Sequence, residues 1–369
     1  MRPLALITLI AAVLVLTVGA DAQPPDVKAK PDPKKVDPKA KIDPEPKLNM
    51  KMTVAEIRLG KSILGAKVES SDLKDKVVLL DYWGVNCPPC LAAMPRTAEL
   101  NAELGEFGLL VLGSHVQGGN EEDVRAVALK HHANFPISIQ TRVRGTEDYN
   151  GLPHCVLFDH TGKCLFRGLP TEVDLLVRKA VGNAIIANAG REKFTSAIEP
   201  ILKDLRAGKS PATILPRVAA MRNFAGDAGA DAKGLLAAMT AGGRKKLERA
   251  ESVISSDPVE AFILVETLPA VYKGSPLATE ASEMLSKLRK EKSVTTEVNA
   301  RQALEGVKKL DQQLNPGAQD PKKPEFQKAN APLLKQLKNK TQQMKKSWPD
   351  ARATKEALET AERYAVEIK

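Results

Sequence analysis

Two cysteines separated by two prolines follow closely on a strongly apolar run, and this arrangement restricts the fold more than any other feature of the sequence. Residues 77–80 suit a strand that is buried on both faces. A helix is predicted to begin near Pro88, and Pro89 beside it also lacks an N–H group and stiffens the turn. Cys87 and Cys90 therefore lie where a strand ends and a helix begins.

This position determines the chemistry of the two thiols. At a helix N-terminus, unpaired backbone N–H groups and the positive end of the helix dipole favour an anion, so Cys87 can exist as a thiolate. Thiols in such settings have pKa values of about 3.5–7.5, and the thiolate is the form that attacks a disulfide. Cys90, one turn into the helix, would then resolve the mixed disulfide. The pattern thus favours reversible disulfide exchange.

Two other interpretations of the pair remain open. A zinc site would need another ligand pair at a spacing typical of zinc fingers, but Cys155 and Cys164 lie in a predicted hairpin. A purely structural disulfide is chemically possible, although so short a loop gains little from closure. We expect Cys155 and Cys164 to face the same side of their hairpin, diagonally, as buried free thiols, with a second disulfide as the alternative. We predict no metal and no organic cofactor.

Several segments together resemble the thioredoxin superfamily, and most closely its TlpA and ResA branch of envelope thiol-disulfide oxidoreductases. They are the run KVVLLDYWGVNCPPC at 76–90, Met94-Pro95 in the following helix, the tripeptide Gly-Leu-Pro at 151–153, and the turn DHTGK at 159–163. The resemblance covers about residues 55–188. It implies an α/β thioredoxin-like domain with a central mixed sheet flanked by helices.

The resemblance also implies roles for individual residues. Cys87 would be the nucleophile, Cys90 the resolving thiol, and Pro153 a cis-proline that packs against the active-site disulfide and helps to hold substrate backbone. Asp81 corresponds to a buried acid that helps to deprotonate the resolving cysteine, although it could be an ordinary polar residue at a strand end. Trp83 corresponds to an aromatic residue in the strand that ends at the active site.

The sequence departs from the family pattern at two positions. Asn86 stands where a tryptophan usually precedes the first cysteine, and His154 follows the proline where small or hydroxyl residues are common. His154 could face solvent, or it could lie near Cys87, where an imidazolium would stabilise the thiolate. The other histidines lack ligand spacing and are expected on the surface or in loops, namely His115, His131, His132 and His160.

The chain divides into four predicted parts. Residues 1–22 have the charge, apolar run and small residues of a secretory signal peptide, the alternative being an uncleaved anchor. Residues 23–48 alternate proline with charge and predict an extended linker. Residues 49–190 would form the thioredoxin-like domain, able to fold and exchange disulfides by itself. Residues 191–369 are predicted to be an all-α region of unknown role.

Local signals place some of the elements. Asp257-Pro258 and Ser275-Pro276 are typical of helix starts. In the thioredoxin-like part, a final helix is predicted from Thr171.

Composition excludes one class of partner. The net charge is +10, but the lysines are dispersed and only 4% of residues are aromatic, so the sequence lacks the footprint of a nucleic-acid reader. We expect a periplasmic or otherwise extracytoplasmic protein, without a membrane span after signal cleavage, that acts on protein dithiols or disulfides with an unknown electron donor. The alternative is a thioredoxin-fold binding or scaffold protein whose helical half docks a partner protein.

Overall fold

The computed structural model describes residues 48–145, 151–314 and 320–368. The predicted signal peptide and all of the predicted linker except Leu48 lie outside these ranges. Within them, no helix combines the length and the apolar character needed to cross a membrane.

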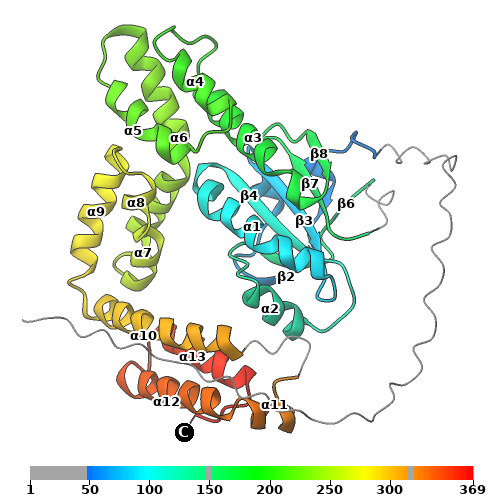
Figure 1. Cartoon of the computed structure of the whole chain (residues 1–369). Coiled ribbons are helices and arrows are strands. Elements are labelled where there is room, and N and C mark those ends of the chain that lie inside the picture. Colours follow the sequence, from blue (N-terminus) through cyan, green and yellow to red (C-terminus); the bar gives the residue numbers. More distant parts are fainter. Residues whose placement is uncertain (1–47, 146–150, 315–319, 369) are drawn as a thin grey trace, which may run out of the picture. The chain divides into compact units, whose positions relative to one another are not determined.

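A six-stranded mixed sheet organises the first part of the described chain (Figure 1), as the sequence implied. Its strands follow the order β2-β5-β4-β3-β7-β8, and β1 and β6 form a separate pair. At the centre, β3 runs parallel to β4 and antiparallel to β7. The bounds of the strands are β1 (Ile57–Arg58), β2 (Lys61–Leu64), β3 (Val77–Trp83), β4 (Leu109–His115), β5 (Ile137–Ile139), β6 (Arg142–Val143), β7 (His154–Phe158) and β8 (Cys164–Gly168).

Strand β3 is buried along its whole length, as expected for a strand covered on both faces. Leu79 and Trp83 face a hydrophobic core to which α1 (Pro88–Leu104), α2 (Glu121–Lys130) and α3 (Asp174–Ala187) contribute. The alternate residues Leu80 and Tyr82 pack in a second core with β1, β6 and the segment that precedes β1. The two faces of β3 thus hold together both layers that cover the sheet.

The last helix of this part begins later than predicted. A short 3₁₀ turn, Pro170–Glu172, occupies the expected start at Thr171, and α3 runs from Asp174 to Ala187. Leu175 remains 53% exposed because the buried face of α3 begins with Val177.

The chain after α3 is helical, as predicted, and includes the helix starts expected at Asp257 and Ser275. The Asp257 carboxylate accepts a hydrogen bond from Glu260 N at 2.9 Å. The Ser275 hydroxyl accepts one from Ala278 N at 3.4 Å. The helices are α4 (Glu199–Arg206), α5 (Pro211–Met221), α6 (Gly226–Val253), α7 (Pro258–Val265), α8 (Leu268–Val271), α9 (Pro276–Leu288), α10 (Lys292–Leu314), α11 (Pro324–Ala329), α12 (Ala331–Ser347) and α13 (Arg352–Arg363).

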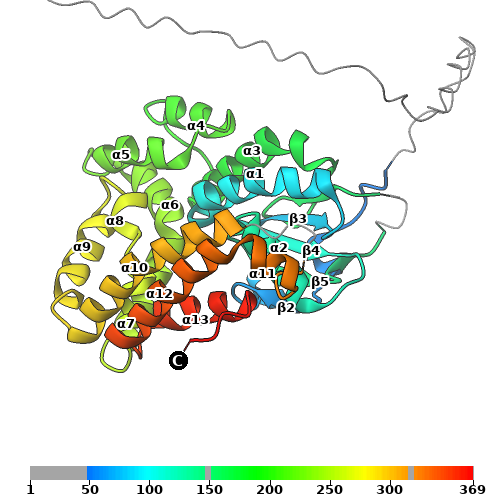
Figure 2. The same ribbon diagram turned by 60° about the horizontal axis from the view of Figure 1, so that its bottom comes forward.

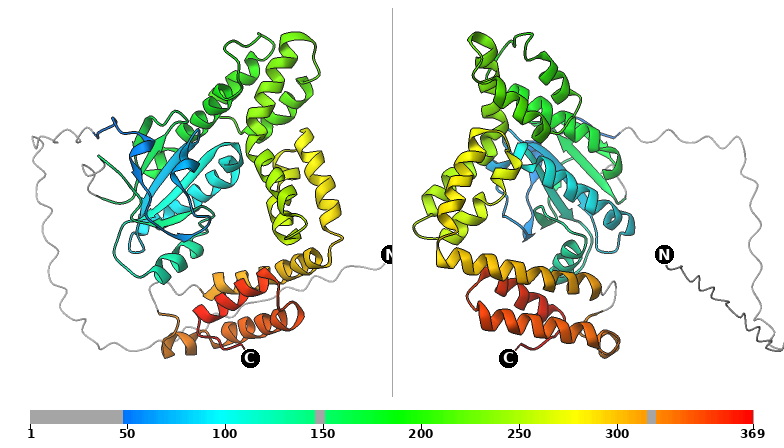
Figure 3. Two further views of the ribbon diagram at one scale, coloured as in Figure 1. Left: turned by 180° about the vertical axis from the view of Figure 1, so that it is seen from behind. Right: turned by 60° about the vertical axis from the view of Figure 1, so that its left-hand side comes forward.

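Among its described residues, the helical part has two hydrophobic cores. The core beneath α1 and α3 continues through α4 to α9 as far as Val294 in α10, and Figure 3 shows α6, α7 and α9 side by side. A separate core joins the rest of α10 to α11, α12 and α13 (Figure 2). Because the first core continues past residue 190, independent folding of residues 49–190 stays a prediction.

A tyrosine of the helical part packs on the turn that follows α1. The Tyr272 ring lies edge-on to Phe107, with 5.6 Å between the ring centroids. Its hydroxyl donates to the Glu106 carbonyl at 2.9 Å and accepts from Gly243 N at 3.0 Å. Gly242 permits this approach, because a Cβ there would lie 2.7 Å from the Glu106 carbonyl oxygen. Helix α6 and the end of α8 are therefore anchored directly on the α/β part.

We predict that this anchor is a major contributor to stability. Tyr272→Phe removes the hydroxyl that donates to the Glu106 carbonyl and accepts from Gly243 N, and it should lower the free energy of unfolding by about 1–3 kcal/mol. Tyr272→Ala also removes the ring and should lower it by about 3–5 kcal/mol. Urea denaturation of the full chain measures both values. If both variants unfolded at the same urea concentration as the wild-type protein, Tyr272 would not contribute to stability as predicted.

Candidate functional site

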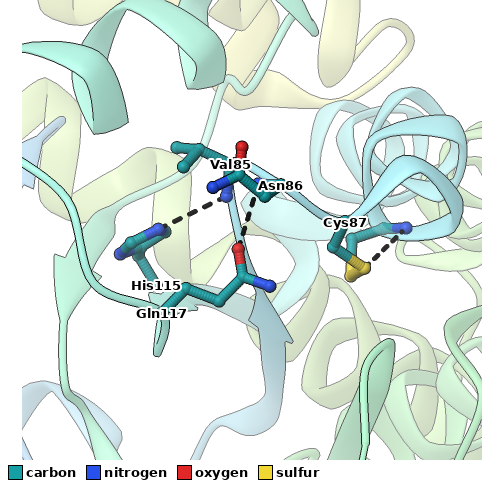
Figure 4. Close-up of a disulfide and its surroundings, with 6 residues drawn as sticks. Val85, Asn86, Cys87, His115 and Gln117 are labelled. Carbon is teal, nitrogen blue, oxygen red and sulfur yellow. Dashed lines mark hydrogen bonds between the residues drawn. A yellow bond between two sulfur atoms is a disulfide. The ribbon is translucent and has the colours of Figure 1, made fainter.

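The two cysteines of the motif form a disulfide at the start of α1, as their position in the sequence predicts. Cys87 is the residue that caps the helix, and Cys90 N donates a hydrogen bond to its sulfur at 3.3 Å (Figure 4). The side chains are largely covered, with exposed fractions of 5% and 4%. After reduction, the same helix N-terminus would favour a thiolate at Cys87.

A groove of about 540 Å³ opens beside Cys87. Gly151 and Leu152 contribute to its wall, and the peptide bond from Leu152 to Pro153 is cis, as the family resemblance implied. The other lining residues are Asn86, Pro88, Pro89, Val116 and Gln117. Cys87, the cysteine assigned as nucleophile, therefore borders a space that a substrate can enter.

Asp81 lies in β3, on the same face as Leu79 and Trp83, beneath α1. It is 5% exposed, and its Oδ2 accepts a hydrogen bond from Thr97 Oγ1 of α1 at 3.2 Å. Burial raises the pKa of Asp81 to about 7, and the Thr97 hydrogen bond partly opposes this rise. A carboxyl group with this pKa can take up or release a proton at neutral pH.

His115 at the end of β4 does not fit the expectation of a surface or loop residue. It is 1% exposed, because it pairs with Trp83 in the sheet and packs edge-on against that ring at 5.1 Å between centroids. Its Nε2 accepts a hydrogen bond from Val85 N at 3.3 Å, and burial lowers its pKa. Nothing near His115 in the sequence signals this contact with the turn before Cys87.

His154 also differs from expectation. It is 2% exposed, pairs with Tyr82 in the sheet and stacks on that ring at 5.9 Å. Since Tyr82 faces the opposite side of the sheet from Trp83 and the cysteine pair, His154 neither faces solvent nor lies on the side of Cys87. The histidine in contact with the turn before Cys87 is His115.

Cys155 and Cys164 are free and buried, as favoured, but the expectation that they face the same side is wrong. Cys155 belongs to the core beneath α1 and Cys164 to the core on the other face. A bulge between Leu157 and Phe158 shifts the register between them. Burial raises the pKa of Cys155 well above its ordinary value, which keeps that thiol protonated. Among the described residues, no group of three or more His, Cys, Asp or Glu side chains could hold a metal ion.

We predict that Asp81 makes stability depend on pH. Its pKa is about 3.9 in an unfolded chain and about 7 when folded, so the folded state holds the extra proton between these values. Stability should therefore fall as pH rises through this window. Asp81→Asn lacks this titration. In urea denaturation of the oxidised protein, its free energy of unfolding relative to that of wild type should therefore rise by about 2–3 kcal/mol from pH 5 to pH 8. An equal difference at both pH values would contradict the assignment.

The α/β part is similar in sequence to known thiol-disulfide oxidoreductases. Residues 49–163 match the AhpC/TSA family. ResA, a thiol-disulfide oxidoreductase of Bacillus cereus, is 34% identical over 101 residues, which are 27% of this chain and 58% of ResA. ResA of Bacillus subtilis is 31% identical over 101 residues, covering 27% of this chain and 56% of that protein. The chain thus spans less than two thirds of these relatives.

Part of the chain is also similar to solved structures of thiol-disulfide proteins. A thiol-disulfide isomerase from Corynebacterium glutamicum has a TM-score of 0.32 at 17% identity, covering 36% of this chain and 97% of the other. A thiol:disulfide interchange protein from Chlorobium tepidum TLS has a TM-score of 0.32 at 19% identity, covering 36% and 99%. From its sheet, its cysteine pair and its matched residues, the chain contains, near residues 49–190, a thioredoxin-like domain that matches the AhpC/TSA family and resembles the ResA thiol-disulfide oxidoreductases.

Proposed function

We propose that the protein is an exported thiol-disulfide oxidoreductase that reduces disulfide bonds of extracytoplasmic proteins through Cys87 and Cys90. The observation that carries this proposal is the Cys87–Cys90 disulfide at the N-terminus of α1, beside an open groove and on the same side of β3 as a buried carboxyl group. The similarity of residues 49–163 to proteins named thiol-disulfide oxidoreductases supports it.

The reaction has two displacement steps. In the reduced protein, the Cys87 thiolate attacks one sulfur of the substrate disulfide, a mixed disulfide forms, and the other substrate sulfur leaves as a thiolate. Cys90 then loses its proton and attacks the Cys87 sulfur, which releases the second substrate thiolate. The substrate gains two electrons and the protein ends as the Cys87–Cys90 disulfide. An external dithiol donor must reduce it again.

Asp81 is proposed as the group that takes the proton from Cys90. Its pKa of about 7 leaves a large share of the carboxyl groups ionised at neutral pH, so they can accept that proton. Thr97, whose hydroxyl donates to Asp81, keeps the carboxyl group directed beneath α1. A group that helps the resolving thiol to attack speeds release of the reduced substrate, which is the step that completes its reduction.

The proposed location rests on the N-terminal sequence. Residues 1–22 are proposed as a signal peptide that is removed on export, and residues 23–48 as a spacer before the folded part. Extracytoplasmic compartments are oxidising, so disulfides are available there as substrates. The proposed partners are therefore protein disulfides and a separate dithiol donor.

An insulin reduction assay with dithiothreitol as the electron donor tests the function. The wild-type protein should accelerate the precipitation of insulin chains, and Cys87→Ser should reduce the rate to that of dithiothreitol alone, because the thiolate that attacks the substrate disulfide is removed. Cys164→Ser provides the matched control. It removes a buried thiol on the far face of the sheet and should keep the wild-type rate. Equal rates for wild type and Cys87→Ser would refute the proposal.

A further inference from the structure

The turn that leads into Cys87 is held by two side chains from the chain at the end of β4. Val85 N donates to His115 Nε2 at 3.3 Å, and Asn86 N donates to the Gln117 amide oxygen at 3.0 Å (Figure 4). His115 is buried behind the turn, whereas Gln117 is half-buried and lines the groove beside Cys87. Of these two residues, only Gln117 can therefore touch both the turn and a bound substrate.

The hydrogen bond to Asn86 fixes the orientation of the Gln117 amide group. A backbone N–H needs an acceptor, and the amide oxygen is the only acceptor that a glutamine side chain offers. The amide nitrogen must then point elsewhere, and in Figure 4 it lies on the side of the amide that faces Cys87. Within the described part of the chain, this nitrogen has no hydrogen-bond partner. It is a fixed donor at the edge of the groove.

Gly84 provides the space for this arrangement. A Cβ at residue 84 would lie 2.1 Å from both the amide carbon and the amide oxygen of Gln117. Any other residue at this position would force the amide group to move. The placement of Gln117 therefore depends on two separate features, the missing side chain at Gly84 and the hydrogen bond from Asn86.

We propose that Gln117 positions the substrate, by donating a hydrogen bond from its amide nitrogen to a backbone carbonyl of the peptide segment that carries the target cysteine. This rests on the proposed function. An amide nitrogen is a donor only, so its partner must be an acceptor. Each residue of a peptide presents a carbonyl oxygen that loses water when it enters a groove and then needs a donor. An extended protein segment meets this requirement, whereas a small disulfide without a peptide backbone does not.

The test compares two substrates with the pre-reduced full chain. Insulin provides a peptide backbone beside its disulfide, and dimethyl disulfide provides a neutral disulfide without any oxygen acceptor. Second-order rate constants come from acid quenching followed by alkylation of free thiols. The measured quantity is the ratio of the insulin rate to the small-disulfide rate, which cancels changes in the intrinsic reactivity of Cys87.

Gln117→Glu keeps an oxygen acceptor for Asn86 N but removes the donor, and Gln117→Met removes both without adding charge. Loss of one hydrogen bond is worth about 1–2 kcal/mol, so the ratio should fall about 5- to 30-fold in both variants. His115→Phe is the matched control, because it removes the other acceptor of the turn while keeping a ring against Trp83. His115→Phe should change the rate constants for the two substrates by a similar factor. Their ratio should then stay within about twofold of the wild-type ratio, a smaller change than the loss of a hydrogen bond would cause.

Two outcomes would overturn the proposal. One is an unchanged ratio in both Gln117 variants, and the other is an equal fall of the ratio in His115→Phe, which would assign the effect to the turn alone. Failure of the proposed function would look different, because the wild-type protein itself would then not reduce insulin.

Discussion

The complete burial of β3 is the constraint on which the site depends. Because β4 and β7 pair with both edges and packed layers cover both faces, the strand cannot shift without exposing apolar side chains. Its alternation places Asp81 and Trp83 on the face beneath α1. Its end at Trp83 forces the chain to turn at Gly84, so that Cys87 becomes the residue that caps α1. Burial of one strand thus sets the positions of both Asp81 and Cys87.

Features that depend on neighbours within a few residues could be predicted from the sequence. The apolar run at 77–80, the prolines after Cys87 and the cap residues Asp257 and Ser275 each act locally, and the structure has elements there as predicted. The cis-proline at 153 and the buried acid at 81 required the family resemblance, because no local pattern distinguishes them from an ordinary proline and an ordinary aspartate.

Features that depend on strand register and on contacts far apart in the chain could not be predicted. His115 and Gln117 reach the turn before Cys87 only because β4 lies beside β3. His154 pairs with Tyr82, and paired residues of neighbouring strands point to the same face of the sheet. His154 therefore faces the side opposite to Cys87. Cys155 and Cys164 separate onto opposite faces because of a bulge in their hairpin. In each case a shift of one residue would reverse the outcome, and the sequence carries no signal of that precision.

The measurement that tests the central claim most directly is equilibration of the Cys87–Cys90 pair against glutathione buffers, with the reduced fraction determined by alkylation. The protein is proposed as a reductant that Asp81 assists, and the imidazole of His154 does not lie on the side of Cys87. The reduction potential is therefore expected to be closer to the thioredoxin value of about −270 mV than to the DsbA value of about −120 mV. A potential above roughly −170 mV on that scale would make the protein an oxidant or isomerase and contradict the account.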